Sequence, residues 1–154
     1  MCSQKVRSVD NELILAEQRC AKNGTRLTKK RKQVLAILLN ADKAASAYDV
    51  IDRYEVEYGE KLPPMSVYRM LDFLVQEHLV HKLKLANKYV ACSDIDSESH
   101  GASQFLICSQ CDRVREVGIN PETVADLKRN SQAAGFKVEL PQLEIECVCH
   151  NCES

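Results

Sequence analysis

Two short cysteine motifs in the second half of the chain have the spacing of metal-binding turns. The sequence CSQC occupies residues 108–111, and CHNC occupies residues 149–152. In each CxxC turn two sulfurs can lie about 2.3 Å from one ion at tetrahedral angles, and two such turns complete a shell of four thiolates. A closed shell leaves no position for a substrate, so the zinc is expected to be structural. The predicted ligands are Cys108, Cys111, Cys149 and Cys152.

Other interpretations of these motifs remain open. A disulfide or a dithiol redox pair also uses closely spaced cysteines, although a redox pair requires only one CxxC turn. Cys147 shares a strand face with Cys149 if residues 143–149 alternate in a strand, and it therefore competes for the metal. We prefer Cys149 because, together with Cys152, it repeats the spacing of the first motif.

Four further residues outside these motifs have side chains that can bind a metal: His81, Cys92, His100 and Glu116. Taken singly, each has an ordinary explanation, because a lone histidine is usually a surface or satisfied core residue and a lone cysteine is usually a small apolar filler. Glu116 shares strand parity with Val114, and a carboxylate on an apolar face needs a partner such as a metal or a base. The spacing of these four residues alone therefore does not decide whether they form a second metal site.

Positive charge is concentrated near the N-terminus, although the 154-residue chain has a net charge of only −1. No acidic residue occurs between Glu17 and Asp42. The basic residues in this interval are Arg19, Lys22, Arg26, Lys29, Lys30, Arg31 and Lys32. Such a segment suits phosphate binding, and a solvated helix face is the alternative interpretation.

Hydrophobic spacing predicts helices throughout the first half of the chain. The first covers residues 9–20, and the second follows Thr28, which is placed to cap it. A third begins where Ser46 and Asp49 resemble a capping box, and Gly59 closes it. These elements must position the basic segment.

A fourth predicted helix starts at Pro63-Pro64 and has two different faces. The buried face consists of Val67, Met70, Leu71 and Leu74. The free face carries Met65, Arg69, Asp72 and Gln76. An arginine on a free helix face is available to a partner.

Two extended runs, residues 80–85 and 88–92, follow the fourth helix. They are joined by Ala86-Asn87, where Asn87 tolerates a positive φ, so the pattern predicts a β-hairpin. Helices followed by a hairpin describe a winged helix, a fold that places one helix in the major groove of DNA.

A polar stretch between Ser93 and Ser103 predicts a hinge at the domain boundary. The predicted domains are residues 1–92, a winged-helix DNA-binding domain, and residues 93–154, which contain the hinge and a small zinc-stapled α/β domain. Domains below about 80 residues usually need such a staple. The second domain is expected to have a helix between Pro121 and Gly135, and strands at 104–108, 113–117, 136–140 and 143–148. The predicted fold class is α+β.

Composition argues against a membrane or secreted protein. No apolar run approaches the roughly 18 residues of a membrane span, and the N-terminus lacks the apolar core of a signal peptide. Eight cysteines acting as thiolates and free thiols fit a reducing cytoplasm. We therefore expect a soluble cytoplasmic protein with no membrane partner and no small-molecule substrate.

Four motifs together resemble the ferric-uptake-regulator family over nearly the whole chain: RLTKKR at 26–31, PMSVYR at 64–69 and the two CxxC turns. Within that family, one branch, the zinc-uptake regulators, represses zinc acquisition when zinc is plentiful. The residues that resemble this branch are His81-Lys82, Tyr89-Val90-Ala91-Cys92, His100, Phe105-Leu106-Ile107-Cys108 and Glu116.

This resemblance implies two zinc sites per chain. It assigns the four CxxC cysteines to a structural zinc, and it implies a homodimer joined through the second half. A regulatory zinc is assigned to His81, Cys92, His100 and Glu116. A thiolate with two imidazoles and one carboxylate suits zinc better than ferrous iron, which prefers harder shells of higher coordination number.

The same resemblance implies the DNA-binding residues. Arg69 and Tyr48 would approach bases, and Tyr68 would lie near the phosphate backbone. Ser66 stands where the family usually has threonine, which keeps a hydroxyl for phosphate. Lys30 and Arg31, in the basic segment, complete the predicted set.

The predicted function is that of a zinc-responsive transcriptional repressor that binds operator DNA as a homodimer. An iron- or peroxide-responsive regulator of the same family is the alternative, and Cys92 argues against it. A zinc-dependent hydrolase is less compatible, because catalytic zinc normally has three protein ligands and a water. An interaction module without DNA binding does not account for the basic segment. The protein is therefore not expected to be an enzyme.

Overall fold

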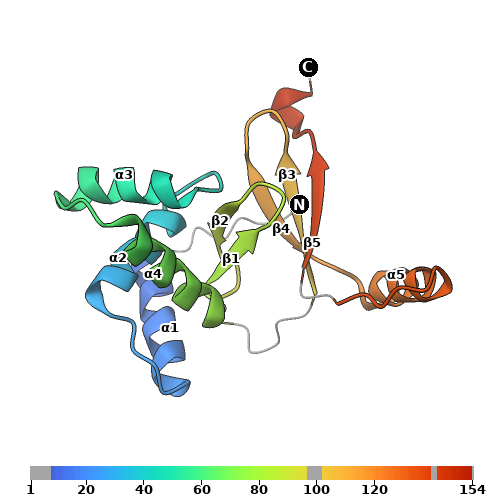
Figure 1. The fold of residues 1–154 in the computed structure, drawn as a ribbon, viewed down its shortest axis with the longest axis horizontal. Coiled ribbons are helices and arrows are strands. Elements are labelled where there is room, and N and C mark those ends of the chain that lie inside the picture. The colour runs from blue at the N-terminus through green and yellow to red at the C-terminus, as the bar shows by residue number, and fades with distance from the viewer. Residues whose placement is uncertain (1–7, 97–101, 140–141, 154) are drawn as a thin grey trace. The chain divides into compact units, whose positions relative to one another are not determined.

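A computed structural model describes residues 8–96, 102–139 and 142–153 of the chain. The chain divides into two compact units, which we call the N-terminal unit, residues 1–96, and the C-terminal unit, residues 97–154. The described residues of the first unit form four α-helices and a β-hairpin, and those of the second form a three-stranded sheet and a fifth α-helix (Figure 1). The fold is α+β, as predicted.

The helices of the N-terminal unit begin at the predicted signals. These helices are α1 (Val9–Lys22), α2 (Lys29–Leu39), α3 (Ala47–Tyr58) and α4 (Pro64–Gln76). The Ser46 hydroxyl accepts from the N–H of Asp49 at 3.1 Å, and the N–H of Ser46 donates to the Asp49 carboxylate at 2.8 Å. The second of these bonds lowers the pKa of Asp49. This capping box is confirmed, and a cap of this kind stabilises a helix by about 1 kcal/mol.

Helix α4 has the two faces that its sequence predicts. Val67, Leu71 and Leu74 are completely buried in the core of the unit, where α2 and α3 also pack. The opposite face is exposed at Met65, Arg69, Asp72 and Gln76. The helix is therefore anchored in the core by one face, and the other face is exposed.

A two-stranded antiparallel hairpin completes this unit. Strand β1 (Val80–Leu83) pairs with β2 (Lys88–Ala91), and Asn87 in the turn adopts a φ of 49°. Tyr89 also forms a bridge with Ala45, in the segment before α3, so the hairpin is tied to the helices. The winged-helix prediction is confirmed.

Residues after the hairpin still belong to the N-terminal unit. Ile95 is buried in its core, and the Arg19 guanidinium on α1 donates to the Ile95 carbonyl at 2.6 Å. The position of the functional domain boundary between residues 92 and 93 stays a prediction.

The C-terminal unit is built on a three-stranded sheet. Strand β3 (Ser103–Cys108) lies between β4 (Val114–Gly118), which is antiparallel to it, and β5 (Gln142–Cys147), which is parallel to it. Helix α5 (Pro121–Ala133) connects β4 to the region before β5. The strand predicted at residues 136–140 is wrong for the described residues 136–139, which pair with no strand in this part of the structure. Alternating hydrophobic and polar residues do not make a strand on their own. Among the described residues, no strand pairs with this segment.

The helices that the structure describes are short compared with a bilayer-spanning helix. Among them, none combines the length and the apolar character needed to cross a membrane.

Candidate metal centres and nucleic-acid interface

The two CxxC turns are brought together by the sheet. Strands β3 and β5 run parallel with Cys108 opposite Cys147, so both turns leave the sheet at the same end. The N–H of Ser109 donates to the Cys147 carbonyl at 2.9 Å and ties one turn to the other. Asp112 adopts a φ of 58° and its N–H donates to the Cys108 carbonyl at 3.0 Å, which reverses the chain directly after the first motif.

The four predicted thiol ligands form one cluster. All four sulfur atoms, from Cys108, Cys111, Cys149 and Cys152, lie within 4.8 Å of one another. The sulfurs of Cys111 and Cys149 are 3.7 Å apart. That distance is close to the roughly 3.8 Å edge of a tetrahedron with zinc–sulfur bonds of about 2.3 Å. It is far longer than a disulfide bond of about 2.05 Å, and all seven cysteines that the structure describes are free.

Hydrogen bonds distribute negative charge unequally within the cluster. Backbone N–H groups of Cys149, Gln110 and Cys111 donate to the Cys108 thiol and lower its pKa to about 6. Side-chain hydrogen bonds with Cys149 and Cys111 raise the pKa of Cys152 to about 12. Full deprotonation of four thiols this close therefore needs a cation among them, and zinc binds thiolates of this geometry. The donor set fits a structural zinc.

Cys147, the competing candidate, lies outside this cluster. Its thiol points to the Ile107 carbonyl, with the sulfur 3.6 Å from that oxygen. The backbone N–H of Cys149, in contrast, donates to the Cys108 sulfur at 3.4 Å. The geometry therefore favours Cys149 over Cys147 as the partner of Cys152.

Two of the four residues assigned to the second metal site meet within the N-terminal unit. His81 lies on β1 and Cys92 directly follows β2, and a ring nitrogen of His81 lies within 4.8 Å of the Cys92 sulfur. Cys92 is only 4% exposed, and its N–H donates to the Leu79 carbonyl at 2.9 Å. Hairpin pairing thus holds an imidazole and a thiol side by side.

The other two residues lie elsewhere in the chain. Glu116 is half-buried on β4 in the C-terminal unit, where its backbone pairs with Phe105 on β3. His100 lies outside the described residues. The full set therefore stays a prediction.

The predicted DNA-binding residues on α3 and α4 differ in exposure. Arg69 is exposed, and Tyr48, the second residue of α3, is 62% exposed. Ser66 is half-buried in the first turn of α4, and Tyr68 is half-buried against the core. Arg69 and Tyr48 are the members of this set with the most surface available for bases.

Arg31 has intramolecular contacts that its sequence does not reveal. Its guanidinium carbon lies 3.7 Å from the centre of the Phe73 ring on α4, and it donates to the Arg26 carbonyl at 2.9 Å. The cation–π contact links the start of α2 to α4. The Arg31 guanidinium is therefore engaged in contacts within the N-terminal unit.

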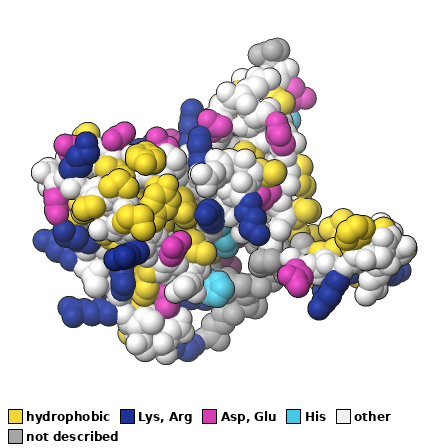
Figure 2. All heavy atoms as spheres, viewed as in Figure 1, with side chains coloured by type: hydrophobic (Ala, Val, Ile, Leu, Met, Phe, Trp, Pro, Cys, Tyr) yellow, Lys and Arg dark blue, Asp and Glu magenta, His cyan; other side chains and the backbone are white. Residues whose placement is uncertain are grey.

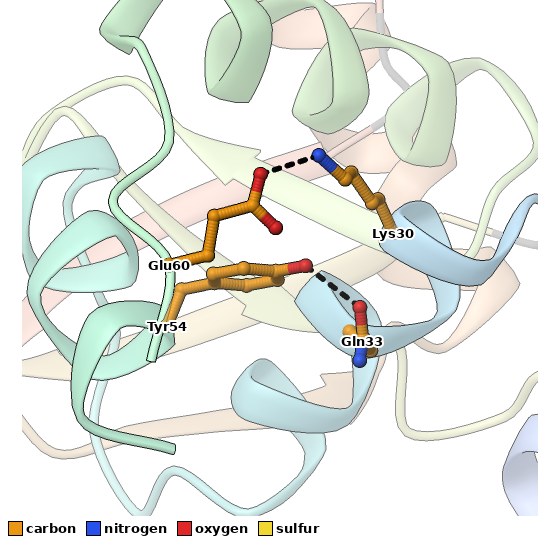
Figure 3. Close-up of polar contacts among 4 residues, drawn as sticks. All are labelled: Lys30, Gln33, Tyr54 and Glu60. Atoms are coloured by element: carbon orange, nitrogen blue, oxygen red, sulfur yellow. Dashed lines mark hydrogen bonds and ion pairs between the residues drawn. The ribbon is translucent and has the colours of Figure 1, made fainter. Parts of the chain in front are cut away.

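Lys30 also has an intramolecular partner, which the sequence analysis missed. Its ammonium nitrogen donates to a carboxylate oxygen of Glu60, just after α3, at a distance of 2.6 Å. Figure 3 shows the two side chains pointing toward each other. This hydrogen bond is the main reason why the pKa of Lys30 is raised. Beside it, the Tyr54 hydroxyl donates to the Gln33 side-chain carbonyl at 2.7 Å and joins α3 to α2. Glu60 follows the capping Gly59, and nothing in the local pattern indicates its partner.

Comparisons with known proteins agree with this architecture. The model of the ferric uptake regulator family matches residues 22–146. The zinc uptake regulation protein of Escherichia coli K12 is 36% identical over 141 residues, which cover 91% of this chain and 80% of that protein. A solved zinc uptake regulator complexed with zinc and DNA is 32% identical, with a TM-score of 0.80 and 95% of both chains covered.

A second solved structure, holo XcZur, is 31% identical with a TM-score of 0.76, and the match covers 94% of this chain and 98% of that one. Iron regulators such as that of Helicobacter pylori, at 19% identity and a TM-score of 0.58, share the fold. The family model covers most of the chain, and the E. coli relative is similar along nearly all of it. The chain belongs to the ferric uptake regulator family.

Proposed function

We propose that this protein is a zinc-responsive transcriptional repressor that acts in the cytoplasm, binds operator DNA as a zinc-loaded homodimer and represses zinc-uptake genes. The observation that carries the proposal is that a winged-helix chain has both a His81–Cys92 pair in its N-terminal unit and a complete four-thiol cluster in its C-terminal unit. Relatives named for zinc uptake regulation, one of them solved with zinc and DNA, support the same function. Transcription regulators of this family are not enzymes.

The N-terminal unit is proposed to bind the operator, with α4 in the major groove. A recognition helix of this class contacts base edges with its exposed face, and Arg69 lies on that face of α4. Tyr48 extends from the start of α3, and Lys30 from the start of α2. Ser66, Tyr68 and Arg31 are proposed to contact or position the phosphate backbone.

The regulatory zinc is proposed to bind His81, Cys92, His100 and Glu116. Thiolate and imidazole are ligands that zinc prefers, and His81 and Cys92 are already held together by the hairpin. Glu116 and His100 come from beyond the first unit, so the proposed ligand set would restrain the DNA-binding unit. In a two-fold dimer, successive major grooves are read only when the recognition helices lie about 34 Å apart. Zinc binding would therefore favour the dimer conformation in which the two α4 helices have the separation required for DNA binding.

The C-terminal unit is proposed to form the homodimer. None of the 13 residues of α5, all of them described, is buried. The unit also exposes large apolar side chains, among them Phe136 at 72%, Val148 at 45% and Val117 at 37%. Apolar surface of this kind is typical of a subunit interface, and a two-fold dimer would bury it twice.

The test of the proposal is metal content followed by a metal titration of DNA binding. Zinc per chain is measured before and after mild chelation, and operator affinity is measured with added zinc, ferrous iron or manganese. We expect two zinc ions per chain, one of them easily removed, and operator binding that returns with zinc alone. Operator binding that follows ferrous iron, or that ignores metals, would contradict it.

Replacing Arg69 by alanine tests α4 as the reader of the operator. Loss of a good base contact is expected to weaken specific binding by about 1 to 3 kcal/mol and to relax the preference at one base position in each half-site. Competition against a set of single-base operator variants measures both effects. If the variant binds its operator as tightly as the parent, another element reads the sequence.

The Lys30–Glu60 pair leads to a prediction about salt dependence. Lys30→Ala is expected to weaken binding to all sequences alike and to reduce the salt slope by about one phosphate contact. Glu60→Gln is expected to have the opposite effect, about two- to fivefold tighter binding at low salt, because the lysine loses an exposed competitor for the phosphate. Affinities at several salt concentrations measure both changes.

Glu57→Gln is the control for that experiment. Glu57 is exposed on α3, and its substitution removes the same charge without touching the Lys30 pair. If Glu57→Gln tightens binding as much as Glu60→Gln, net charge rather than release of Lys30 explains the effect.

A further inference from the structure

The first turn of α4 presents an apolar side chain where a polar one would be ordinary. Met65 is the second residue of the helix and is 64% exposed. Met70, on the same helix, is instead partly buried against the core. Arg69 follows Met65 by four residues, so the two side chains are neighbours on the exposed face.

Hydrogen-bond donors are scarce in the same turn. Pro63 and Pro64 have no N–H, and the N–H of Ser66 donates to the Pro63 carbonyl at 3.0 Å. Beside the Ser66 hydroxyl, which is proposed to face phosphate, the exposed Met65 side chain is the apolar surface that this turn offers to a partner. What it contacts must be apolar if the contact is to be favourable.

Base edges in the major groove carry one apolar group, the C5 methyl of thymine. The N-terminal residues of a recognition helix are those that contact base edges. Figure 2 shows hydrophobic side chains on the surface of the helical unit, with lysine, arginine and also acidic side chains around them. The basic side chains can contact phosphates beside a base edge. An exposed methionine four residues before Arg69 is suited to a thymine methyl.

We propose that Met65 reads a thymine methyl group next to the base contacted by Arg69. This inference rests on the proposed function, because it requires α4 to lie in the major groove. Arg69 would supply hydrogen bonds to a guanine, and Met65 would add selection for thymine over cytosine at the adjacent position. The two residues together would define a dinucleotide step in each half-site.

Deoxyuridine provides the test, because it differs from thymidine only in the missing methyl group. Operators are first selected from random duplexes with the zinc-loaded parent protein. Each thymine is then replaced by deoxyuridine at equivalent positions of both half-sites, and affinity is measured by fluorescence anisotropy. We expect one position, adjacent to the base whose preference Arg69→Ala relaxes, to lose about fourfold per half-site on removal of the methyl.

Met65→Ala should bind the thymine operator more weakly and should no longer distinguish thymine from deoxyuridine at that position. Leu85→Ala is the matched control, because Leu85 is also an exposed apolar residue, at 67%, but lies in the hairpin turn. This control should keep the full discrimination. The inference is overturned if Met65→Ala discriminates as the parent does, or if no thymine position responds in the parent. Failure of the proposed function would differ, since the parent would then show no zinc-dependent operator binding at all.

Discussion

Replacing Cys149 by serine is expected to release the tightly bound zinc of the four-thiol cluster and to dissociate the dimer. Cys149 holds the cluster in two ways, with its sulfur 3.7 Å from that of Cys111 and its N–H donating to Cys108. Structural zinc stabilises small peptide domains by about 10 to 16 kcal/mol of apparent binding free energy at neutral pH. A unit with so small a sheet depends on that contribution.

The measurements are zinc per chain, subunit mass in solution and circular dichroism. Cys108→Ser should give the same loss, because it removes another of the four sulfurs. Cys147→Ser is the matched control on β5, and it should keep both zinc and dimer because its sulfur makes only a 3.6 Å contact with the Ile107 carbonyl. A variant at Cys147 that loses the dimer, beside one at Cys149 that keeps it, would show that the ligand assignment is wrong.

Features encoded by local spacing could be predicted from the sequence. The Ser46–Asp49 capping box and the positive φ at Asn87 each depend on a few neighbouring residues. The CxxC turns are local in the same sense, and two of them are enough to predict that four thiols converge. The two faces of α4 were predictable because helical periodicity fixes which side chains share a face.

Features that depend on distant side chains could not be predicted in this way. Glu60 reaches Lys30 across 30 residues, and Arg31 reaches Phe73 from another helix. Both contacts change the interpretation of the basic segment, because part of its charge is engaged within the unit. The failed strand at residues 136–139 has a related cause, since a strand requires a neighbouring edge that alternation alone does not specify.

Replacing Cys92 by serine is expected to abolish the response to zinc while leaving the folded dimer and its structural zinc intact. Serine is nearly the same size as cysteine, and the N–H of residue 92 can still donate to the Leu79 carbonyl, so the hairpin should keep its shape. A hydroxyl is a much poorer zinc ligand than a thiolate, and the remaining harder ligands would hold the ion weakly. Ferrous iron should therefore compete better in the variant than in the parent.

The size of the effect follows from the coupling between the metal and DNA sites. Allosteric couplings are typically about 1 to 3 kcal/mol, so zinc should tighten operator binding of the parent by roughly 5- to 150-fold per effector site. In Cys92→Ser that factor should fall close to one over the same range of zinc concentration. The measurement is a zinc titration of operator binding by fluorescence anisotropy at matched salt.

Cys20→Ser is the matched control, because Cys20 is also a buried free cysteine of the N-terminal unit but lies on α1. Burial raises the pKa of the Cys20 thiol, which keeps it protonated and inert near neutral pH. This control should reproduce the parent's zinc curve. If Cys92→Ser also follows that curve, the regulatory site does not include Cys92, and the His81–Cys92 pair would have to be explained as hairpin packing. A flat curve for Cys92→Ser alone would show that this thiol couples zinc to the operator.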